Sequence, residues 1–433
     1  MIRLIALFWL TLTIQTAQAL PVIQSATLDN GLRVLLIEAH NVPMVAMQLS
    51  LPAGSRFDAK HKAGSAAMLA AMLSDHTAKH DQKSWADWLD FEALHLGAGA
   101  SRDTLNISLT VVKASLSEGL DALSEALLKP GWNPQRFKIL QEDSVASAIK
   151  SQESPNVLAA QATASLLYGQ AGYGHVSSGT ATSLNHIHLQ DLKVLYREQI
   201  KPQGAVLAVS GDIRMRELLP MLNQRLSAWK GKPRHAALSI SPVHPKKAQI
   251  KYVALPTSQA LLQFSRIGIA RSDKNFFPLF VMNHYLGGGG FGSILMEEVR
   301  EKRGLVYGVY SYFIPLAGQG PFVITLQTRA SQAEKAATVV RNVMKSLVAG
   351  DIDSKRLQAT KDNLTGGFAQ RMDSNRERVA LMAMIGFYHM PLDYLQRWTE
   401  EVDSVTVADI KKMAKHYLQP SQWHLIQVGP VKE

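Results

Sequence analysis

The sequence of 433 residues contains no cysteine. Disulfide bonds and a lipid attached to a signal-peptide cysteine are therefore both excluded. The apolar run within residues 1–14 is shorter than the ~20 residues that a helix needs to span a bilayer, so we expect no membrane span. The 46 basic residues include no run of five or more, which favours a solvated basic surface over nucleic-acid binding.

The N-terminus has the pattern of a secretory signal peptide. Arg3 precedes an apolar core, and Ala17-Gln18-Ala19 supplies the small-x-small pattern of a cleavage site. We predict cleavage near Ala19, which lowers the formal charge from +11 to +10 through the loss of Arg3. A chain without thiols has nothing to mispair in an oxidising compartment, so we expect the periplasm of a Gram-negative bacterium.

The two halves of the chain repeat one pattern of helix, turn, strand and glycine at a constant offset of 218 residues. The matching pairs are Asp191 and Asp409, Pro202 and Pro420, and Gly211 and Gly429. Upstream, residues 105–128 and 322–348 each predict a strand followed by an amphipathic helix. Strands alternating with long amphipathic helices predict an α+β fold with helices packed on the sheets.

Composition divides the chain into four segments. Residues 1–19 form the predicted signal peptide, 20–231 an N-terminal domain and 249–433 a C-terminal domain. Residues 232–248 are rich in proline and small residues and lack a helical period, so we predict an interdomain linker there. With 46% apolar residues, a chain of this length can bury at least two cores.

A predicted buried helix over residues 62–73 carries three alanines on one face. Ala67, Ala70 and Ala71 stand at i, i+3 and i+4. Methyl groups bind no metal and transfer no proton. None of the 14 histidines lies in H-x-x-E-H or H-E-x-x-H, the helical patterns of zinc peptidases. We therefore expect no catalytic residue and no metal ligand on this helix.

Two further segments carry recognisable motifs. The first is Leu28-Asp-Asn-Gly-Leu-Arg-Val-Leu-Leu-Ile-Glu38. The second is the glycine-rich stretch from Tyr285, followed by Arg300-Glu-Lys-Arg-Gly-Leu-Val-Tyr307. Through these motifs the chain resembles the pitrilysin/insulinase-type zinc peptidases (inverzincins) over about residues 24–430. The resemblance implies two homologous sandwich domains, each a mostly antiparallel sheet covered by helices, that together form half of a peptidase clamshell.

The resemblance also implies that the alanine face is a degenerate zinc site. In the family this face carries H-x-x-E-H, which comprises two zinc ligands and the general base. The family pattern puts the two histidines at Ala67 and Ala71, the catalytic glutamate at Ala70, and the third ligand, a downstream glutamate, at Ser147. Zinc needs three or four nitrogen, sulfur or oxygen ligands. We therefore expect no metal in this chain and zinc in a partner subunit.

Arg300 and Tyr307 match the family's R-E-x-x-G-L-x-Y motif. The resemblance implies that this pair lies in the C-terminal domain and faces a zinc site across a chamber. A fixed cation and a phenolic hydroxyl can orient a peptide carbonyl and stabilise the oxyanion that forms under attack. The alternative is structural, with an arginine that caps a helix end and a tyrosine in a sheet. We expect the neighbouring Arg303 to be solvated.

Three other features each have two interpretations. His76 and His80 lie four residues apart and either share a helix face as metal ligands or occupy a polar turn. Glycines 287–290 lack the Gly-Lys-Ser/Thr of a phosphate loop, which favours a tight turn into the next helix. Residues 96–105 form either a plain hairpin or, as in the family's proteases, an edge strand that binds extended peptides by strand addition.

These features predict a non-catalytic subunit of a periplasmic, heterodimeric zinc metallopeptidase, inactive on its own. The resemblance implies a partner that is a homologous exported subunit with H-x-x-E-H. It also implies substrates that are peptides or unfolded protein segments. The alternative function is that of a proteolytically inactive scaffold or peptide-binding protein.

Overall fold

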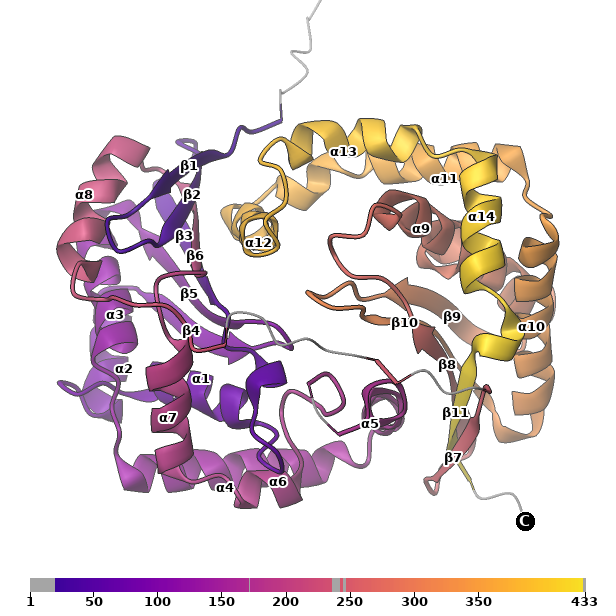
Figure 1. Ribbon diagram of the computed structural model, residues 1–433, viewed down its shortest axis with the longest axis horizontal. Helices are drawn as coiled ribbons and strands as arrows, with labels where there is room; N and C mark the ends of the chain where they lie inside the picture. The colour runs from indigo at the N-terminus through magenta and orange to yellow at the C-terminus, as the bar shows by residue number, and fades with distance from the viewer. Residues whose placement is uncertain (1–19, 171, 236–241, 244–246, 431–433) are drawn as a thin grey trace, which may run out of the picture.

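The computed structural model describes residues 20–170, 172–235, 242–243 and 247–430 (Figure 1). The predicted signal peptide lies outside the described residues, and so do residues 236–241 and 244–246 of the predicted linker. Among the described helices, none is long and apolar enough to cross a membrane.

The first sheet has six strands in the order β1-β2-β6-β3-β5-β4. They are β1 (Gln24–Thr27), β2 (Arg33–Glu38), β3 (Met44–Leu51), β4 (His95–Ala100), β5 (Leu105–Val112) and β6 (Val206–Gly211). Only the β2–β6 pair is parallel, and β4 lies at the edge of the sheet. Apolar and polar residues alternate along the strands, so that one face of the sheet packs on helices of the N-terminal half.

The second sheet repeats this order strand for strand without a counterpart of β1. It runs β7-β11-β8-β10-β9, and again only one pair, β7–β11, is parallel. The strands are β7 (Ile250–Ala254), β8 (Gln259–Ile267), β9 (Val306–Phe313), β10 (Pro321–Arg329) and β11 (His424–Gly429). The prediction of two homologous, mostly antiparallel α+β sandwiches is therefore confirmed.

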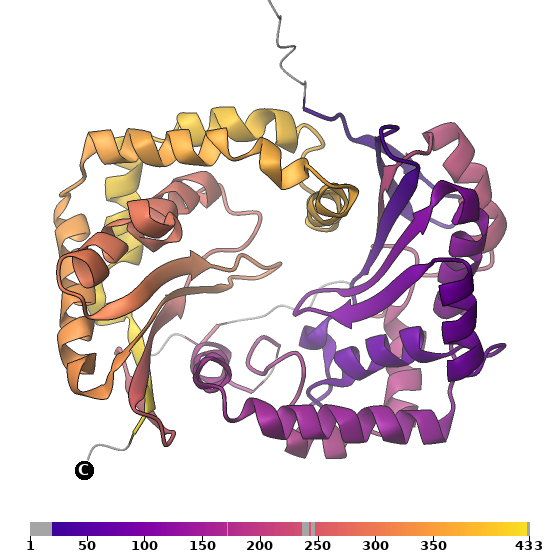
Figure 2. The ribbon, with the colours of Figure 1, turned by 180° about the vertical axis from the view of Figure 1, so that it is seen from behind.

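Helices cover the outer faces of both sheets (Figures 1 and 2). Those of the first half are α1 (Ser65–Asp75), α2 (Gln82–Phe91), α3 (Leu116–Leu128), α4 (Pro134–Ser151), α6 (Ala181–Asn185), α7 (Leu189–Gln199) and α8 (Met215–Leu226). Those of the second half are α9 (Phe276–Asn283), α10 (Ala333–Ala349), α11 (Ser354–Gly366), α13 (Tyr394–Asp403) and α14 (Val407–Tyr417). Their apolar sides form two large cores.

Two helices cross between the halves and cover the inner sheet faces. Helix α12 (Asn375–Phe387) packs on β2, β6 and β3 of the first sheet, and α5 (Pro155–Tyr168) packs on β7, β11 and β8 of the second. A Cβ on Gly386 of α12 would lie 2.6 Å from Val206, so glycine permits the close approach. In α5, Ala159 packs beside Ile426. Each sheet therefore needs a helix from the other half to bury its inner face.

A buried carboxylate also joins the two halves. Asp103, in the turn between β4 and β5, is completely buried. It accepts hydrogen bonds from the hydroxyls of Tyr173 (2.6 Å) and Tyr388 (2.9 Å) and from the backbone N–H of Ala317 (2.8 Å). The guanidinium of Arg56 lies 3.2 Å away. Ala317 lies between β9 and β10, so Asp103 ties the β4–β5 hairpin to the β9–β10 hairpin, and the two hairpins reach toward each other in Figure 2.

Candidate functional site

Helix α1 starts at a sharp turn that a buried acid stabilises. Gly64 precedes the helix with φ of 100°, a left-handed conformation that favours glycine. The carboxylate of Asp58 accepts hydrogen bonds from the backbone N–H groups of Gly64 (2.8 Å) and Ala66 (2.9 Å). Burial raises the pKa of Asp58 to about 7, against the opposing effect of these two bonds. The acid thus fixes the start of the helix that carries the alanine face.

The alanine face does not fit a zinc ion. On α1, Ala70 is buried, whereas Ala67 and Ala71 are half-buried. Helix α4 packs against α1, and Ser147 lies exposed on it. In the part of the chain that the structure describes, no group of three or more histidine, aspartate or glutamate side chains could hold a metal ion. Zinc needs at least three such ligands, so no hydrolytic step can be assigned to this helix.

The two histidines after α1 are engaged by other residues and do not converge. His76 is buried; its Nδ1 lies 2.8 Å from the carboxylate of Asp75, and its Nε2 accepts from the backbone N–H of Asn133. His80 stacks on the ring of Trp88, with 5.4 Å between ring centroids. These contacts support the interpretation of a polar turn and leave no pair of free imidazoles.

The structure brings Arg300 and Tyr307 together. Arg300 lies in a π-helical turn (Met296–Glu301), and Tyr307 lies near the start of β9. The guanidinium carbon lies 5.6 Å from the centroid of the Tyr307 ring, within cation–π range. Tyr307 is 90% exposed, so its hydroxyl faces solvent rather than the core. The sequence motif therefore forms one exposed cation–phenol pair.

Phe291 completes this group and was not singled out by the sequence. Its ring centroid lies 4.6 Å from the Arg300 guanidinium, and the side chain is 67% exposed. The ring follows the glycine run, and Gly290 has φ of 58° with open space around it. A large apolar residue inside a glycine-rich turn was the available signal. Arg300 thus lies between two exposed rings at the end of a tight turn.

Neighbouring cations differ from Arg300 in being paired with acids. The carboxylate of Glu298 accepts from Lys302 and from Arg303, each at 2.6 Å. The hydrogen bond from Lys302 is the largest cause of the lowered pKa of Glu298. Among the described residues, Arg300 forms no side-chain hydrogen bond or ion pair, so its N–H donors are available to an incoming carbonyl.

A large groove lies beside the edge strand β4. Its volume is about 1050 Å³, and it runs between the start of α12 and the inner face of β3, β5 and β4. Its floor is made of small or polar residues, namely Gln48, Gly97, Gly99, Asn106, Ser108 and Thr110. Residues 96–105 thus form a hairpin whose first strand is an edge strand, and strand addition there stays a prediction.

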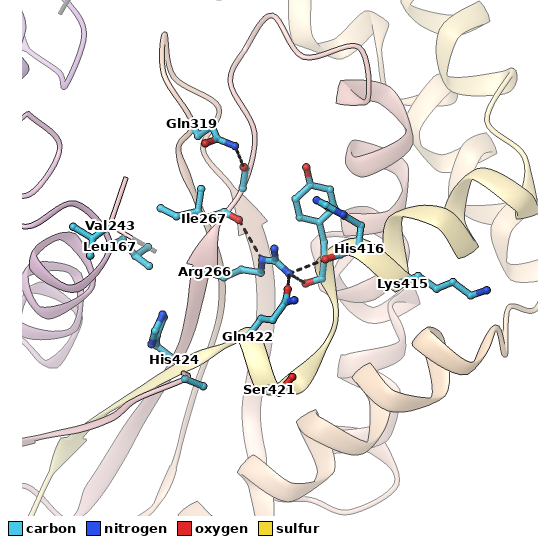
Figure 3. A pocket seen from close by; sticks show the side chains of 13 residues that line it. Leu167, Val243, Arg266, Ile267, Gln319, Lys415, His416, Ser421, Gln422 and His424 are labelled. Carbon is cyan, nitrogen blue, oxygen red and sulfur yellow. Dashed lines mark hydrogen bonds between the residues drawn. The ribbon is translucent and has the colours of Figure 1, made fainter. Parts of the chain in front are cut away.

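The cavity of Figure 3, about 490 Å³, has a structural explanation. The guanidinium of Arg266 donates to the carbonyl oxygens of His416 and Tyr417, each at 2.9 Å, and thereby caps the end of α14. Burial lowers its pKa to about 10. His424 pairs with Ser265, the residue before Arg266, so the two basic side chains lie on opposite sheet faces. They do not converge on a common ligand.

Comparison with known proteins places the chain among peptidase homologues. Residues 33–168 match the family model described as insulinase (peptidase family M16), and residues 186–364 match the peptidase M16 inactive domain. The non-peptidase homolog YmxG of Helicobacter pylori is 24% identical over 393 residues, which are 89% of each chain. The uncharacterized zinc protease YmxG of Bacillus subtilis is 23% identical over 83% of this chain and 86% of its own.

A solved structure covers nearly the whole chain. The crystal structure of a peptidase M16 inactive domain from Pseudomonas fluorescens matches with a TM-score of 0.89 and 31% identity, over 95% of this chain and 98% of that one. A protease structure from Helicobacter pylori, at 18% identity and a TM-score of 0.88, supports the fold alone. The chain belongs to the insulinase family, peptidase family M16, and is a homologue of its non-peptidase members.

Proposed function

We propose that this protein is the non-catalytic subunit of a periplasmic, heterodimeric zinc metallopeptidase. The observation that carries the proposal is the division of parts within one chain. The helix that would hold zinc presents Ala67, Ala70 and Ala71, whereas Arg300 and Tyr307 form an exposed pair with available donors. A chain with one set of parts and without the other is useful in catalysis when a homologous subunit with H-x-x-E-H supplies the zinc.

The geometry gives each residue of the pair a role. Tyr307 offers an exposed phenolic hydroxyl, and Arg300 offers several N–H donors from a planar cation. Both can donate to one peptide carbonyl and stabilise the negative charge that develops on its oxygen. The rings of Phe291 and Tyr307 restrict the guanidinium, so less side-chain entropy is lost when the peptide binds.

The test combines the mature protein with an H-x-x-E-H homologue from the same host. Alone, the protein should contain no stoichiometric zinc and cleave no peptide. The mixture should show more chelator-sensitive peptidase activity than the partner alone. Arg300→Ala or Tyr307→Phe should lower kcat by ~10²–10³, the typical loss for one oxyanion donor, while the heterodimer stays intact.

Arg303→Ala provides the matched control, because Arg303 already pairs with Glu298 on the same turn. This variant should retain the stimulation within about threefold. Unchanged turnover in both Arg300→Ala and Tyr307→Phe would refute the substrate-orienting role. Tightly bound zinc in the isolated chain would refute the division of labour.

The location is a separate part of the proposal, because it depends on residues 1–19. N-terminal sequencing of protein recovered from the periplasmic fraction should start after Ala19. A cytoplasmic protein with intact residues 1–19 would refute it.

A second function, that of a proteolytically inactive peptide-binding protein, is favoured by one observation. The edge strand β4 borders a groove of about 1050 Å³. Peptide binding by the chain alone, together with no stimulation of any zinc-bearing homologue, would favour this function over the first.

A further inference from the structure

The inner face of the first sheet is only half covered. Helix α12 lies over β2, β6 and part of β3, and no helix lies over β5 and β4 among the described residues. The strand register shows which residues share this face, because side chains alternate between the two faces. Gly97 pairs with Ser108, and Gly99 pairs with Asn106. All four residues line the groove beside β4.

Neither glycine of β4 is required by the backbone or by packing. A Cβ on Gly99 would meet nothing within 4 Å, and one on Gly97 would meet only the Ser108 hydroxyl, at 3.7 Å. Neither residue has a positive φ. Glycine inside a strand weakens it, and commonly marks a place where a ligand or another backbone approaches closely. The two glycines therefore keep the groove floor empty at a cost to local stability.

The second half of the chain shows that this module accepts large residues at the same positions. Ser108 and Asn106 correspond to Thr325 and Val323 at the repeat offset of 217 residues. In the second sheet, Thr325 pairs with Tyr310 and Val323 pairs with Tyr312. Gly97 and Gly99 therefore stand where the other half carries two partly exposed tyrosines, 48% and 40% exposed respectively. The groove results from a difference in sequence and not from the fold itself.

The outer edge of β4 is open to a further strand. Within the described part of the chain, β4 pairs with β5 and with no other strand. Its other face is anchored, because Leu96 and Ala98 pack on the core of the N-terminal half. An extended segment that adds to this edge alternates its own side chains between the two faces. Every second side chain then points toward the groove above Gly97 and Gly99.

The walls of the groove favour an apolar side chain. They include Val42, Met44, Leu89 and Val379. Charged groups at the groove belong to both signs, with Asp90 and Asp373 against Arg376 and Arg378, so no net charge selects the ligand. The volume of about 1050 Å³ is far larger than a single alanine or serine side chain needs. Burial of a large apolar group therefore gives the strongest gain in binding.

We propose that β4 binds an extended peptide by strand addition and that the groove above Gly97 and Gly99 selects a bulky apolar side chain, such as phenylalanine. This inference specifies the substrate of the peptide-binding role described above and rests on it. It concerns the isolated chain and needs neither zinc nor a partner subunit. The pair of glycines is thus a determinant of specificity on the half of the protein that lacks catalytic residues.

The experiment measures peptide affinity by fluorescence anisotropy with the mature protein alone. The probes are two labelled, acetylated ten-residue peptides of high strand propensity that differ at one central position, phenylalanine against alanine. Wild-type protein should bind the phenylalanine peptide about 10- to 100-fold more tightly, the range that burial of this side chain supports. N-methylation of alternate backbone amides in that peptide should abolish binding, because strand addition needs these N–H groups.

Two variants test the glycines. Gly97→Val and Gly99→Val fill the floor in open space, and each should reduce the preference for phenylalanine to below about threefold while the fold stays intact. Gly366→Ala is the matched control, since a Cβ there also meets nothing within 4 Å but the residue lies in α11. It should retain the preference.

Equal binding of both peptides, no binding of either, or an unchanged preference in the two valine variants would overturn the inference. None of these results bears on stimulation of a zinc-bearing partner through Arg300 and Tyr307. Conversely, failure of that stimulation leaves the peptide preference of the isolated chain untouched. The two proposals can therefore fail independently.

Discussion

Replacement of Asp103 with asparagine is expected to destabilise the protein by ~3–5 kcal/mol, the usual loss when one partner of a buried ion pair is removed. Asparagine has the same shape but carries no charge. Arg56, which is 6% exposed, would stay buried without a counter-ion. The backbone N–H of Ala317 donates to Asp103 Oδ2 and would lose its bond wherever the new amide group faces it.

The structure also predicts where the damage is localised. Asp103 is held by Tyr173 on its own half and by Tyr388 and Ala317 on the other. Burial, followed by the nearby Asp103 charge, raises the pKa of both tyrosines, so they stay protonated donors. Loss of the carboxylate should loosen the contact between the halves before either core unfolds. Amide hydrogen exchange at residues 317–318 should therefore increase more than exchange in the central strands.

Urea unfolding followed by tryptophan fluorescence and circular dichroism measures the loss. Asp121→Asn is the control, because Asp121 forms an exposed ion pair with Arg225 and is 55% exposed at its side chain. Exposed pairs contribute ~1 kcal/mol or less. If Asp103→Asn lost no more stability than Asp121→Asn, the reasoning that this carboxylate joins the halves would be refuted.

Three further predictions concern the same architecture. Burial raises the pKa of Asp58 from its ordinary value of 3.8 to about 7 in the folded protein, so its contribution to stability is full at low pH and is lost as the pH rises toward 7. Asp58→Asn should remove this part of the pH dependence between pH 4 and 7, measured as the change in Tm; an identical pH profile would contradict the assignment. Gly386→Ala should cost ~1–3 kcal/mol in urea unfolding by overpacking α12 on the first sheet, whereas Gly366→Ala in open space should gain ~0.5–1 kcal/mol. Residues 20–231 and 249–433 made as separate polypeptides should each lack a cooperative transition and regain it on mixing, because each sheet is covered by a helix of the other half; cooperative unfolding of either piece alone would be evidence against the exchange of helices.

The repeated fold and the exposed pair could both be predicted from short stretches of sequence. Strand and helix periods survive in the local pattern, so the constant offset between Gly211 and Gly429 marks two copies of one module. Arg300 and Tyr307 lie seven residues apart, and a turn followed by a strand is enough to bring them together. Phe291 was missed because an aromatic residue in a loop is equally compatible with simple exposure.

The sequence by itself determined the two α+β modules, the missing metal ligands on the first helix and the motif that holds Arg300 and Tyr307, because hydrophobic period and residue chemistry are local properties. Only the tertiary structure decided that α5 and α12 exchange places, that Asp103 ties the hairpins together and that Gly97 and Gly99 lie under an open groove. These features depend on strand register and on contacts between residues far apart in the chain. Asp103 and Tyr388, for example, are 285 positions apart, and no local pattern encodes which distant groups will meet.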